Sequence, residues 1–435
     1  MISSPFVFLV LSGLSWLTLV FNRLPPTNIL GSVPPPGIIS LSKEARRDKK
    51  HPDKSLGPTN LQIVRNATPV DLAYVDVSGN HERDPHRGAR DEKGNWGYVH
   101  DETALRKHPP AFPTDRLEQD CKERDADQAM LTEKVFVDRE AHDAKKGTKR
   151  AKILCIIYAI DASHEKRIPA IRETWGQKCD GFMVGSNKTD TSLDTIDIAH
   201  AGPEIYENMF QKVRSVWSYV YDYYYDKYDW FHIGGDDMYV LVENLRLYLE
   251  SDEIQVAANG GTYLPIGNET SQTPLYLGRR LALDGKMSRI YNSGGPGYTL
   301  NKAALKLLVT GGWGGDPDRE TYAEDVWVAK AFLKEGVMAY DTKDETGAER
   351  YMHYPVSRSP YGLLSYFPSA ASLTHLLQPG LHYNEKLEVE YSWYIKDSID
   401  IAMGLNHSSA RSVAFHYISP ELMRRMHALL YGMCK

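Results

Sequence analysis

The sequence predicts an α/β layered domain with a central, mostly parallel sheet, and three observations indicate this fold class. An unbroken apolar run rich in β-branched residues, ILCIIYAI, follows Lys152 and is typical of a strand buried on both faces. Helix-like and strand-like segments then alternate, which favours βαβ units. The tight turn GGDD follows one of these strands, and ligands of such folds bind beyond the carboxyl ends of strands.

The elements after the first strand are expected in a regular order. A helix-like segment, SHEKRIPAIRETWG, is followed by the short strand GFMVG and a second apolar stretch near TIDIAHAG. A long helix is expected over about residues 204–225, because five large residues recur on one face: Met209, Val213, Trp217, Val220 and Tyr224. The strand DWFHI then leads into the GGDD turn, and a helix is expected over residues 242–249.

The C-terminal half carries further patterns of the same kind. A glycine-rich loop, YNSGGPGYTL, precedes the helical segment NKAALKLLV, and a second apolar periodic segment is VWVAKAFLKEG. The run SVAFHYI near the C-terminus is strand-like. The glycine-rich loop lacks the spacing of a dinucleotide or P-loop motif, so it is either a pocket wall or a tight turn.

The first part of the chain differs in composition from the rest. Residues 5–21 carry no charge and can enter a bilayer as an uncleaved anchor, a signal peptide or a core helix. The anchor over residues 1–22 fits best, because a basic n-region and a small-residue cleavage site are both missing. The basic cluster at residues 43–50 follows the span, against the positive-inside trend for a cytosolic N-terminus.

The domain organisation follows from these differences. Residues 23–148 read as a stem, largely disordered, with a helix expected within 115–145, and residues 149–435 as the folded domain. The net charge of −6 gives no basic field for nucleic acid, so we expect no such partner. Four cysteines without C-x-x-C spacing are compatible with one or two disulfides.

Two carboxylate pairs could carry chemistry. Asp236 and Asp237 stand in the GGDD turn, where they could bind Mg²⁺ or Mn²⁺ together with substrate phosphates, or simply start the next helix. Glu324 and Asp325 open a helical segment, where one could act as a general base or both could cap the helix. His416, in the strand-like run near the C-terminus, is by default a core histidine.

As an ordered set, the segments from about Lys152 to Tyr431 resemble the core 1 β1,3-galactosyltransferase family (glycoprotein-N-acetylgalactosamine 3-β-galactosyltransferases), within the β1,3-glycosyltransferases. The matching segments are ILCIIYAIDASHEKRIPAIRETW, YENMFQKVRSVWSYVY, YDWFHIGGDDMYVLVENLRLYL, YNSGGPGYTLNKAALK, AEDVWVAK and SVAFHYISPELM. The resemblance implies a GT-A type fold, a type II Golgi or ER membrane anchor with a lumenal catalytic domain, and Mn²⁺ (or Mg²⁺). It also implies inverting transfer from UDP-galactose to the 3-hydroxyl of O-linked N-acetylgalactosamine on a glycoprotein.

The resemblance assigns roles residue by residue. It implies a metal held by Asp237 and His416, catalysis by Asp325 as base beside Glu324, and a disulfide between Cys155 and Cys179. Three further residues are expected to bind the donor: Asp236, Arg172 and Lys212. Tyr291 and Trp393 are candidates for stacking on sugars, since flat aromatic faces suit pyranose rings.

The chain departs from the family pattern at several positions. Gly235 stands where the family usually has Asp, Met238 where it has Thr, and Ser408 and Ser409 replace a double cysteine. The cysteines that flank the family's Glu-Asp motif are absent as well. Two rival functions therefore stay open: a β1,3-transferase that uses another UDP-sugar, and a non-catalytic lumenal chaperone or sugar-binding relative. The sequence is compatible with a homodimer.

Overall fold

The structure is a computed structural model that describes residues 109–114, 117, 134–266, 273–311, 313, 319–354, 393–402 and 404–433. The expected anchor at residues 1–22 and most of the expected stem lie outside these residues. Within the described part, no helix is both long and apolar enough to cross a bilayer. A short helix, α6 (Arg139–Ala144), lies in the range 115–145 where one was expected.

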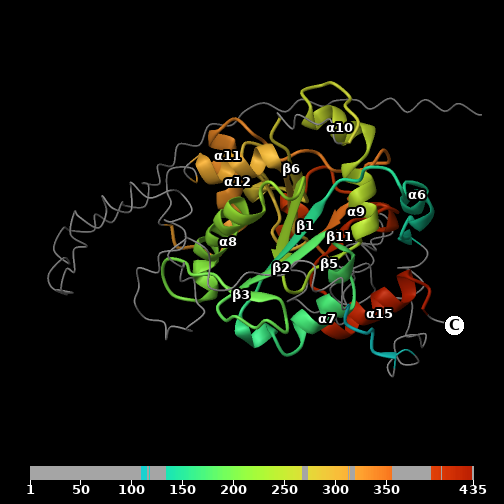
Figure 1. The fold of residues 1–435 in the computed structure, drawn as a ribbon. Helices are drawn as coiled ribbons and strands as arrows, with labels where there is room; N and C mark the ends of the chain where they lie inside the picture. Colours follow the sequence, from blue (N-terminus) through green and yellow to red (C-terminus); the bar gives the residue numbers. More distant parts are fainter. Residues whose placement is uncertain are drawn as a thin grey trace, which may run out of the picture. The chain divides into compact units, whose positions relative to one another are not determined.

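The described residues form a six-stranded, mostly parallel sheet in the order β3-β2-β1-β4-β9-β6, which confirms the predicted α/β class (Figure 1). Strands β1 to β4 run parallel, and β9 runs antiparallel to β4 and β6. Their bounds are β1 (Ile153–Tyr158), β2 (Gly181–Ser186), β3 (Thr195–Asp197), β4 (Trp230–Gly235), β6 (Tyr276–Gly278) and β9 (Tyr298–Asn301). Asp236 and Asp237 follow β4 directly, so the acidic turn lies at a carboxyl end as predicted.

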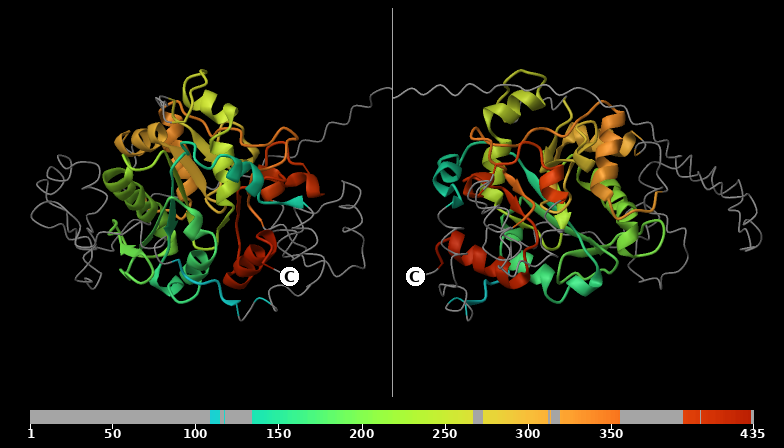
Figure 2. Two further views of the ribbon diagram at one scale, coloured as in Figure 1. Left: turned by 45° about the vertical axis from the view of Figure 1, so that its right-hand side comes forward. Right: turned by 180° about the vertical axis from the view of Figure 1, so that it is seen from behind.

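Two hydrophobic cores cover the two faces of this sheet. The ribbon views in Figure 2 show helices on both sides of it. Ile153, Cys155 and Ile157 of β1 belong to one core, and Leu154 and Ile156 belong to the other. Because successive side chains of a strand point to opposite faces, a strand covered on both sides must be apolar throughout. This explains the unbroken apolar run from which the fold class was predicted.

Helices divide between the two faces. The core that includes Ile153 is closed by α7 (Arg167–Glu173), α9 (Val242–Leu249), α10 (Asp252–Ala258) and α15 (Pro420–Leu430). The core that includes Leu154 is closed by α8 (Met209–Tyr224), α11 (Lys302–Thr310) and α12 (Glu324–Lys334). The described part also contains the 3₁₀ turns η2 (Asp161–Ser163), η3 (Gly176–Lys178), η4 (Tyr206–Asn208), η5 (Leu283–Gly285) and η8 (Gly404–His407).

The long helix predicted over residues 204–225 is α8. It starts at Met209, later than expected, because the preceding residues form the 3₁₀ turn η4. Val213, Trp217 and Val220 of the predicted face are fully buried, but so are residues on other faces, such as Phe210 and Val216. The helix lies between β1 and the pair α11 and α12, so it is covered on more than one side.

A three-stranded sheet joins the C-terminal region to the acidic turn. Its order is β10 (Tyr351–Met352), β11 (Ala414–Phe415) and β5 (Tyr239–Val240), and a separate pair consists of β7 (Arg280–Ala282) and β8 (Ile290–Asn292). Phe415 pairs with Tyr239 in antiparallel register, and the Ile418 backbone N–H donates to the Asp237 carbonyl oxygen at 2.9 Å. This pairing carries the residue after β11, His416, to the turn before β5.

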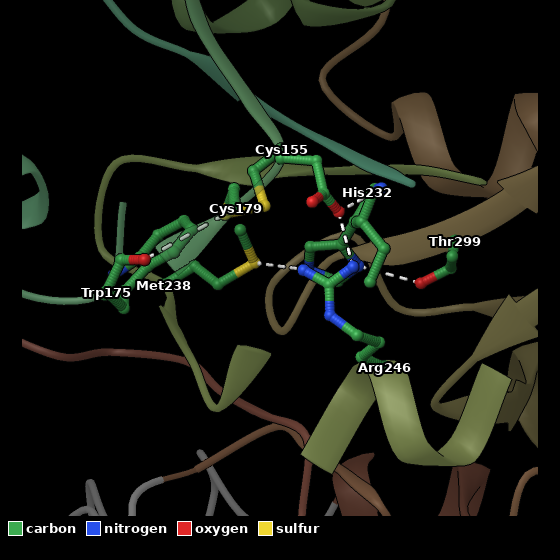
Figure 3. Close-up of a disulfide and its surroundings, with 9 residues drawn as sticks. Cys155, Trp175, Cys179, His232, Met238, Arg246 and Thr299 are labelled. Atoms are coloured by element: carbon green, nitrogen blue, oxygen red, sulfur yellow. Dashed lines mark hydrogen bonds and ion pairs between the residues drawn. A yellow bond between two sulfur atoms is a disulfide. The ribbon is translucent and has the colours of Figure 1, made fainter. Parts of the chain in front are cut away.

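The disulfide expected from the resemblance is present, between Cys155 of β1 and Cys179 (Figure 3). Both cysteines are buried in the core on the α7 side of the sheet. Met238, the residue after the acidic pair, lies close by with its Sδ 3.2 Å from Nε2 of His232. The disulfide therefore fixes the chain directly after η3 to the central strand β1.

A buried ion pair ties the segment that contains Trp393 to the body of the domain. The fully buried Arg279 guanidinium pairs with Glu349, donates to the Tyr394 hydroxyl at 2.9 Å and donates to the Ser398 hydroxyl at 2.8 Å. Breaking a buried pair by removing one partner leaves an uncompensated charge.

We predict that Glu349→Ala lowers the free energy of unfolding by about 3–5 kcal/mol, measured by urea denaturation. The matched control is Glu345→Ala, whose carboxylate lies 3.8 Å from Arg350 and is 85% exposed. A surface pair of this kind contributes at most about 1 kcal/mol. Equal losses of stability in the two variants would contradict the assignment of Glu349 as the partner of a buried charge.

Candidate active site

Asp236 is held by two side chains from the segment after β1. Arg167, the first residue of α7, donates from Nη1 to Asp236 Oδ1 at 2.8 Å, and the Ser163 hydroxyl donates to Oδ2. Burial raises the pKa of Asp236, while these hydrogen bonds and the Arg167 charge act in the opposite direction. The side chain is thus oriented by a cation and a hydroxyl, neither of which the sequence analysis had singled out.

Asp237 and His416 lie against each other, although they are far apart in the sequence. His416 Nε2 is 3.4 Å from Asp237 Oδ1, and Arg167 Nη1 is 3.7 Å from Asp237 Oδ2. Burial pushes the pKa of Asp237 up, but the hydrogen bond to His416 and the nearby charges outweigh it and lower the pKa. Asp237 is therefore held as a carboxylate between an imidazole and a guanidinium.

The glycine-rich loop separates this cluster from the second carboxylate pair. A methyl group at Gly295 would overlap Nδ1 of His416, and one at Gly294 would overlap Oε1 of Glu324. The loop can pass this close to both side chains only because the two residues lack a Cβ. The loop connects β8 to β9 and packs against side chains of both clusters.

Asp325 opens α12 with both of its carboxylate oxygens engaged by backbone groups. The Gly294 N–H donates to Oδ2 at 2.8 Å, and the Val326 N–H donates to Oδ1 at 2.8 Å. Burial raises the pKa of Asp325, and these hydrogen bonds and the proximity of His416 oppose that shift. The carboxylate is half-buried and oriented towards the loop, and each oxygen keeps a lone pair for a further partner.

Glu324, unlike the half-buried Asp325, lies deep in the core. The Trp217 indole N–H donates to the Tyr298 hydroxyl, which in turn donates to Glu324 Oε2, both at 3.1 Å. Oε1 is buried and has no hydrogen-bond partner among the described residues. Burial, reinforced by the charge of Asp325, raises the pKa of Glu324 well above its ordinary value. Burial thus favours the protonated form of Glu324.

The raised pKa of Glu324 predicts a pH-dependent stability. The folded chain holds the Glu324 proton more tightly than the unfolded chain, so stability falls as pH rises above the ordinary carboxyl value of 4.5. Glu324→Gln keeps the acceptor for Tyr298 but cannot ionise. We expect its thermal midpoint to fall less between pH 5 and pH 8 than that of the wild type. Parallel midpoint curves for the two proteins would contradict a protonated Glu324.

Two of the predicted donor residues lie in ion pairs of their own. Arg172 donates to Asp194 Oδ2 at 2.9 Å and to the Ser192 carbonyl oxygen at 2.7 Å. Lys212 is buried and donates to Glu204 Oε1 at 2.7 Å, and burial lowers its pKa. Among the described residues, neither side chain forms an ion pair with Asp236 or Asp237, although the charge of Asp236 acts on Lys212.

The predicted stacking residues lie in different surroundings. Tyr291 is buried in β8 within the core on the α12 side, and burial, with the Asp325 charge, raises its pKa. Trp393 is half-buried and meets the His353 ring edge to face, with centroids 5.2 Å apart. His353 in turn lies 5.2 Å from the His416 ring, so Trp393 is two rings away from the acidic turn.

Among the described residues, no group of three or more His, Cys, Asp or Glu side chains is placed to hold an ion. Asp237 and His416 offer one carboxylate and one imidazole, which suits Mn²⁺ or Mg²⁺ completed by substrate phosphates and water. His416 Nδ1 is buried without a hydrogen-bond partner, so Nε2 is the nitrogen turned towards Asp237. The residues present therefore fit an ion with two protein ligands.

The chain has a distant relative among known proteins. No protein-family model matches the chain. A relative is the glycoprotein-N-acetylgalactosamine 3-beta-galactosyltransferase 1 of Xenopus laevis, which is 26% identical over 286 residues, 65% of this chain and 67% of the relative. Together with the disulfide, this homology favours the secretory pathway. The distant homology supports the β1,3-glycosyltransferase family broadly, with a sugar-nucleotide donor and a glycan acceptor.

Proposed function

We propose that the chain is an inverting β1,3-galactosyltransferase that transfers galactose from UDP-galactose to the 3-hydroxyl of N-acetylgalactosamine linked to Ser or Thr of a glycoprotein. One observation carries the proposal. A single glycine loop, at Gly294 and Gly295, touches both the Asp237–His416 pair and the Glu324–Asp325 pair. The carboxylate proposed to bind the ion and the candidate base thus border the same loop, which supports one shared site. The name of the Xenopus relative supports this donor and acceptor.

On the donor side, Asp237 and His416 would hold Mn²⁺ or Mg²⁺. When bound, the ion would offset the negative charge of the departing diphosphate. Arg167 would orient Asp236 and present its remaining N–H donors to the phosphates, as a guanidinium fork is suited to do. A role of Arg172 and Lys212 in donor binding remains a prediction. They would act indirectly, by stabilising the loops that contain their partners Asp194 and Glu204.

On the acceptor side, Asp325 would accept the proton of the attacking 3-hydroxyl. Its two backbone hydrogen bonds fix the direction of the carboxylate, and its raised pKa makes it a stronger base than an exposed Asp. Glu324, held by the Trp217–Tyr298 chain, would stay neutral beside Asp325. Trp393 and Tyr291 remain predictions as supports of the sugar rings.

A panel of UDP-sugars with the purified protein tests the donor. We expect product only when UDP-galactose and an O-linked N-acetylgalactosamine acceptor are present, with a divalent ion. Equal or greater transfer from UDP-N-acetylglucosamine or UDP-glucuronic acid would replace the proposal by a β1,3-transferase of another donor. Binding of the acceptor without transfer from any UDP-sugar would favour the non-catalytic relative, a possibility to which Gly235 points because it removes one carboxylate of the family motif.

We also propose a Golgi or ER membrane location, with residues 1–22 as a type II anchor and the domain at residues 149–435 in the lumen. The disulfide and the homology support the compartment, while the anchor rests on the sequence alone. We expect the domain at residues 149–435 to be protected from protease in sealed microsomes. Cleavage of that region without detergent would contradict a lumenal domain.

Arg167 gives a prediction with two opposite effects. Its guanidinium neutralises Asp236 and approaches Asp237, so it competes with a cation for these carboxylates but attracts a diphosphate. We expect Arg167→Ala to bind Mn²⁺ alone more tightly and to bind UDP in the presence of Mn²⁺ about tenfold or more weakly. Calorimetric titrations measure both. The control is Arg289→Ala, which removes an exposed guanidinium that pairs with Asp284, and equal effects of the two changes would contradict the assignment.

A further inference from the structure

A pair of stacked tyrosines stands exposed at the edge of the proposed active site. Tyr206 lies in η4, and Tyr322 lies just before α12. Their ring centroids are 5.8 Å apart, with an angle of 11° between the ring planes. Their side chains are nonetheless 66% and 60% exposed, so packing within the domain does not account for the apolar surface that they leave in water. We call this pair the tyrosine shelf.

Hydrogen bonds hold the segments that carry the tyrosine shelf in place. The Phe210 N–H, in the first turn of α8, donates to the Thr321 carbonyl oxygen at 3.0 Å, and the Gln211 side chain donates to the Arg319 carbonyl oxygen at 3.0 Å. These bonds tie the residues before α12 to the start of α8. The two rings are therefore held side by side by two helices, which limits the entropy that a ligand must remove on binding.

The tyrosine shelf lies near the candidate base, Asp325. Burial raises the pKa of Tyr206, and the next contributions are the charges of Asp325 and the neighbouring Tyr322, followed by Asp237. The Tyr206 hydroxyl thus lies within electrostatic reach of Asp325. Tyr322 precedes Asp325 by three residues, and its carbonyl oxygen accepts the Glu324 N–H at 2.9 Å. The shelf consequently borders the side from which the proposed acceptor reaches the base.

We propose that the tyrosine shelf binds the peptide segment of a glycopeptide acceptor next to the residue that carries the sugar. The inference rests on the proposed function. A sugar whose hydroxyl faces the half-buried Asp325 must direct its glycosidic link outwards, where the exposed rings stand. The spacing of 5.8 Å between the rings is close to the repeat of about 6.6 Å between alternate side chains of an extended peptide. Flat aromatic faces suit proline and other apolar side chains.

Two acceptors that differ only in the peptide test this binding site. One is a glycopeptide with N-acetylgalactosamine on Thr, and the other is the methyl glycoside of the same sugar. For Tyr206→Ala and Tyr322→Ala we expect KM for the glycopeptide to rise about tenfold. KM for the methyl glycoside should change less than about twofold, and kcat less than about threefold. Tyr206→Phe and Tyr322→Phe keep the rings and should restore the wild-type KM.

The control variant is Tyr263→Ala, which removes a ring that is also 53% exposed and belongs to another surface segment. It should leave both KM values at the wild-type level. An unchanged glycopeptide KM in the two shelf variants, an equal rise for both acceptors, or a weaker Kd for UDP would each overturn the proposal. Failure of the wild type to galactosylate either acceptor would instead contradict the proposed function, so the two failures are distinguishable.

Discussion

Asp325→Asn is expected to lower kcat by about 10²–10⁴-fold, the usual contribution of a general base. The amide retains an oxygen that can accept one of the two backbone hydrogen bonds, from Gly294 or from Val326, so the helix start should persist. It cannot accept the proton of the acceptor hydroxyl. Initial rates at saturating donor and acceptor, with thermal midpoints to verify folding, measure the effect.

The control for this change is Glu335→Gln, at the exposed opposite end of α12, which should retain wild-type kcat. Hydroxide in solution can partly replace the missing carboxylate as the base. The loss of kcat in Asp325→Asn should therefore become smaller as pH rises. Retention of more than about a tenth of wild-type kcat by Asp325→Asn would exclude a role as base. The proton would then have to go to another group of the site.

Asp237→Ala is the second change with a large expected effect. It removes the carboxylate that lies between His416 and Arg167, and with it one of the two proposed protein ligands of the ion. We expect kcat to fall by about 10²–10³-fold, because stabilisation of charge on the leaving group is usually the largest single contribution to catalysis. Raising the Mn²⁺ concentration should recover only part of this loss, which a titration of rate against Mn²⁺ measures.

His416→Ala provides a matched comparison for Asp237→Ala. If the two side chains act on one ion, the double variant should lose little more activity than the more severe single variant, because such residues act as a unit. Additive losses would indicate two independent roles. An unaltered Mn²⁺ requirement in both single variants would show that the ion, if needed, binds elsewhere.

The fold was predictable where burial dictates the sequence pattern. The run after Lys152 had to be apolar throughout because both faces of β1 are covered, and the helices α9 and α11 followed from local periodicity. The start of α8 was misplaced because residues 206–208 turn as a 3₁₀ segment before the helix begins. Propensity alone does not distinguish a 3₁₀ start from an α-helical one.

The candidate site was predictable only where a motif was recognisable. Local reasoning treated His416 as a core residue, and only the resemblance paired it with Asp237, because pairing between β5 and β11 is a long-range contact. Arg167 and Arg172 share one short helix, and their sequence context does not tell which one reaches the acidic turn. The stacking of Tyr206 on Tyr322 joins two segments that are far apart in the sequence, so no local sequence pattern predicts it.

Titration of UDP into the purified protein with and without Mn²⁺ tests the central claim most directly, that an ion between Asp237 and His416 holds the sugar nucleotide. We expect UDP to bind the wild type only when Mn²⁺ is present, and we expect Asp237→Ala and His416→Ala both to abolish this binding without lowering the thermal midpoint. Equal affinity for UDP in the absence of Mn²⁺, or undiminished binding by Asp237→Ala, would contradict it.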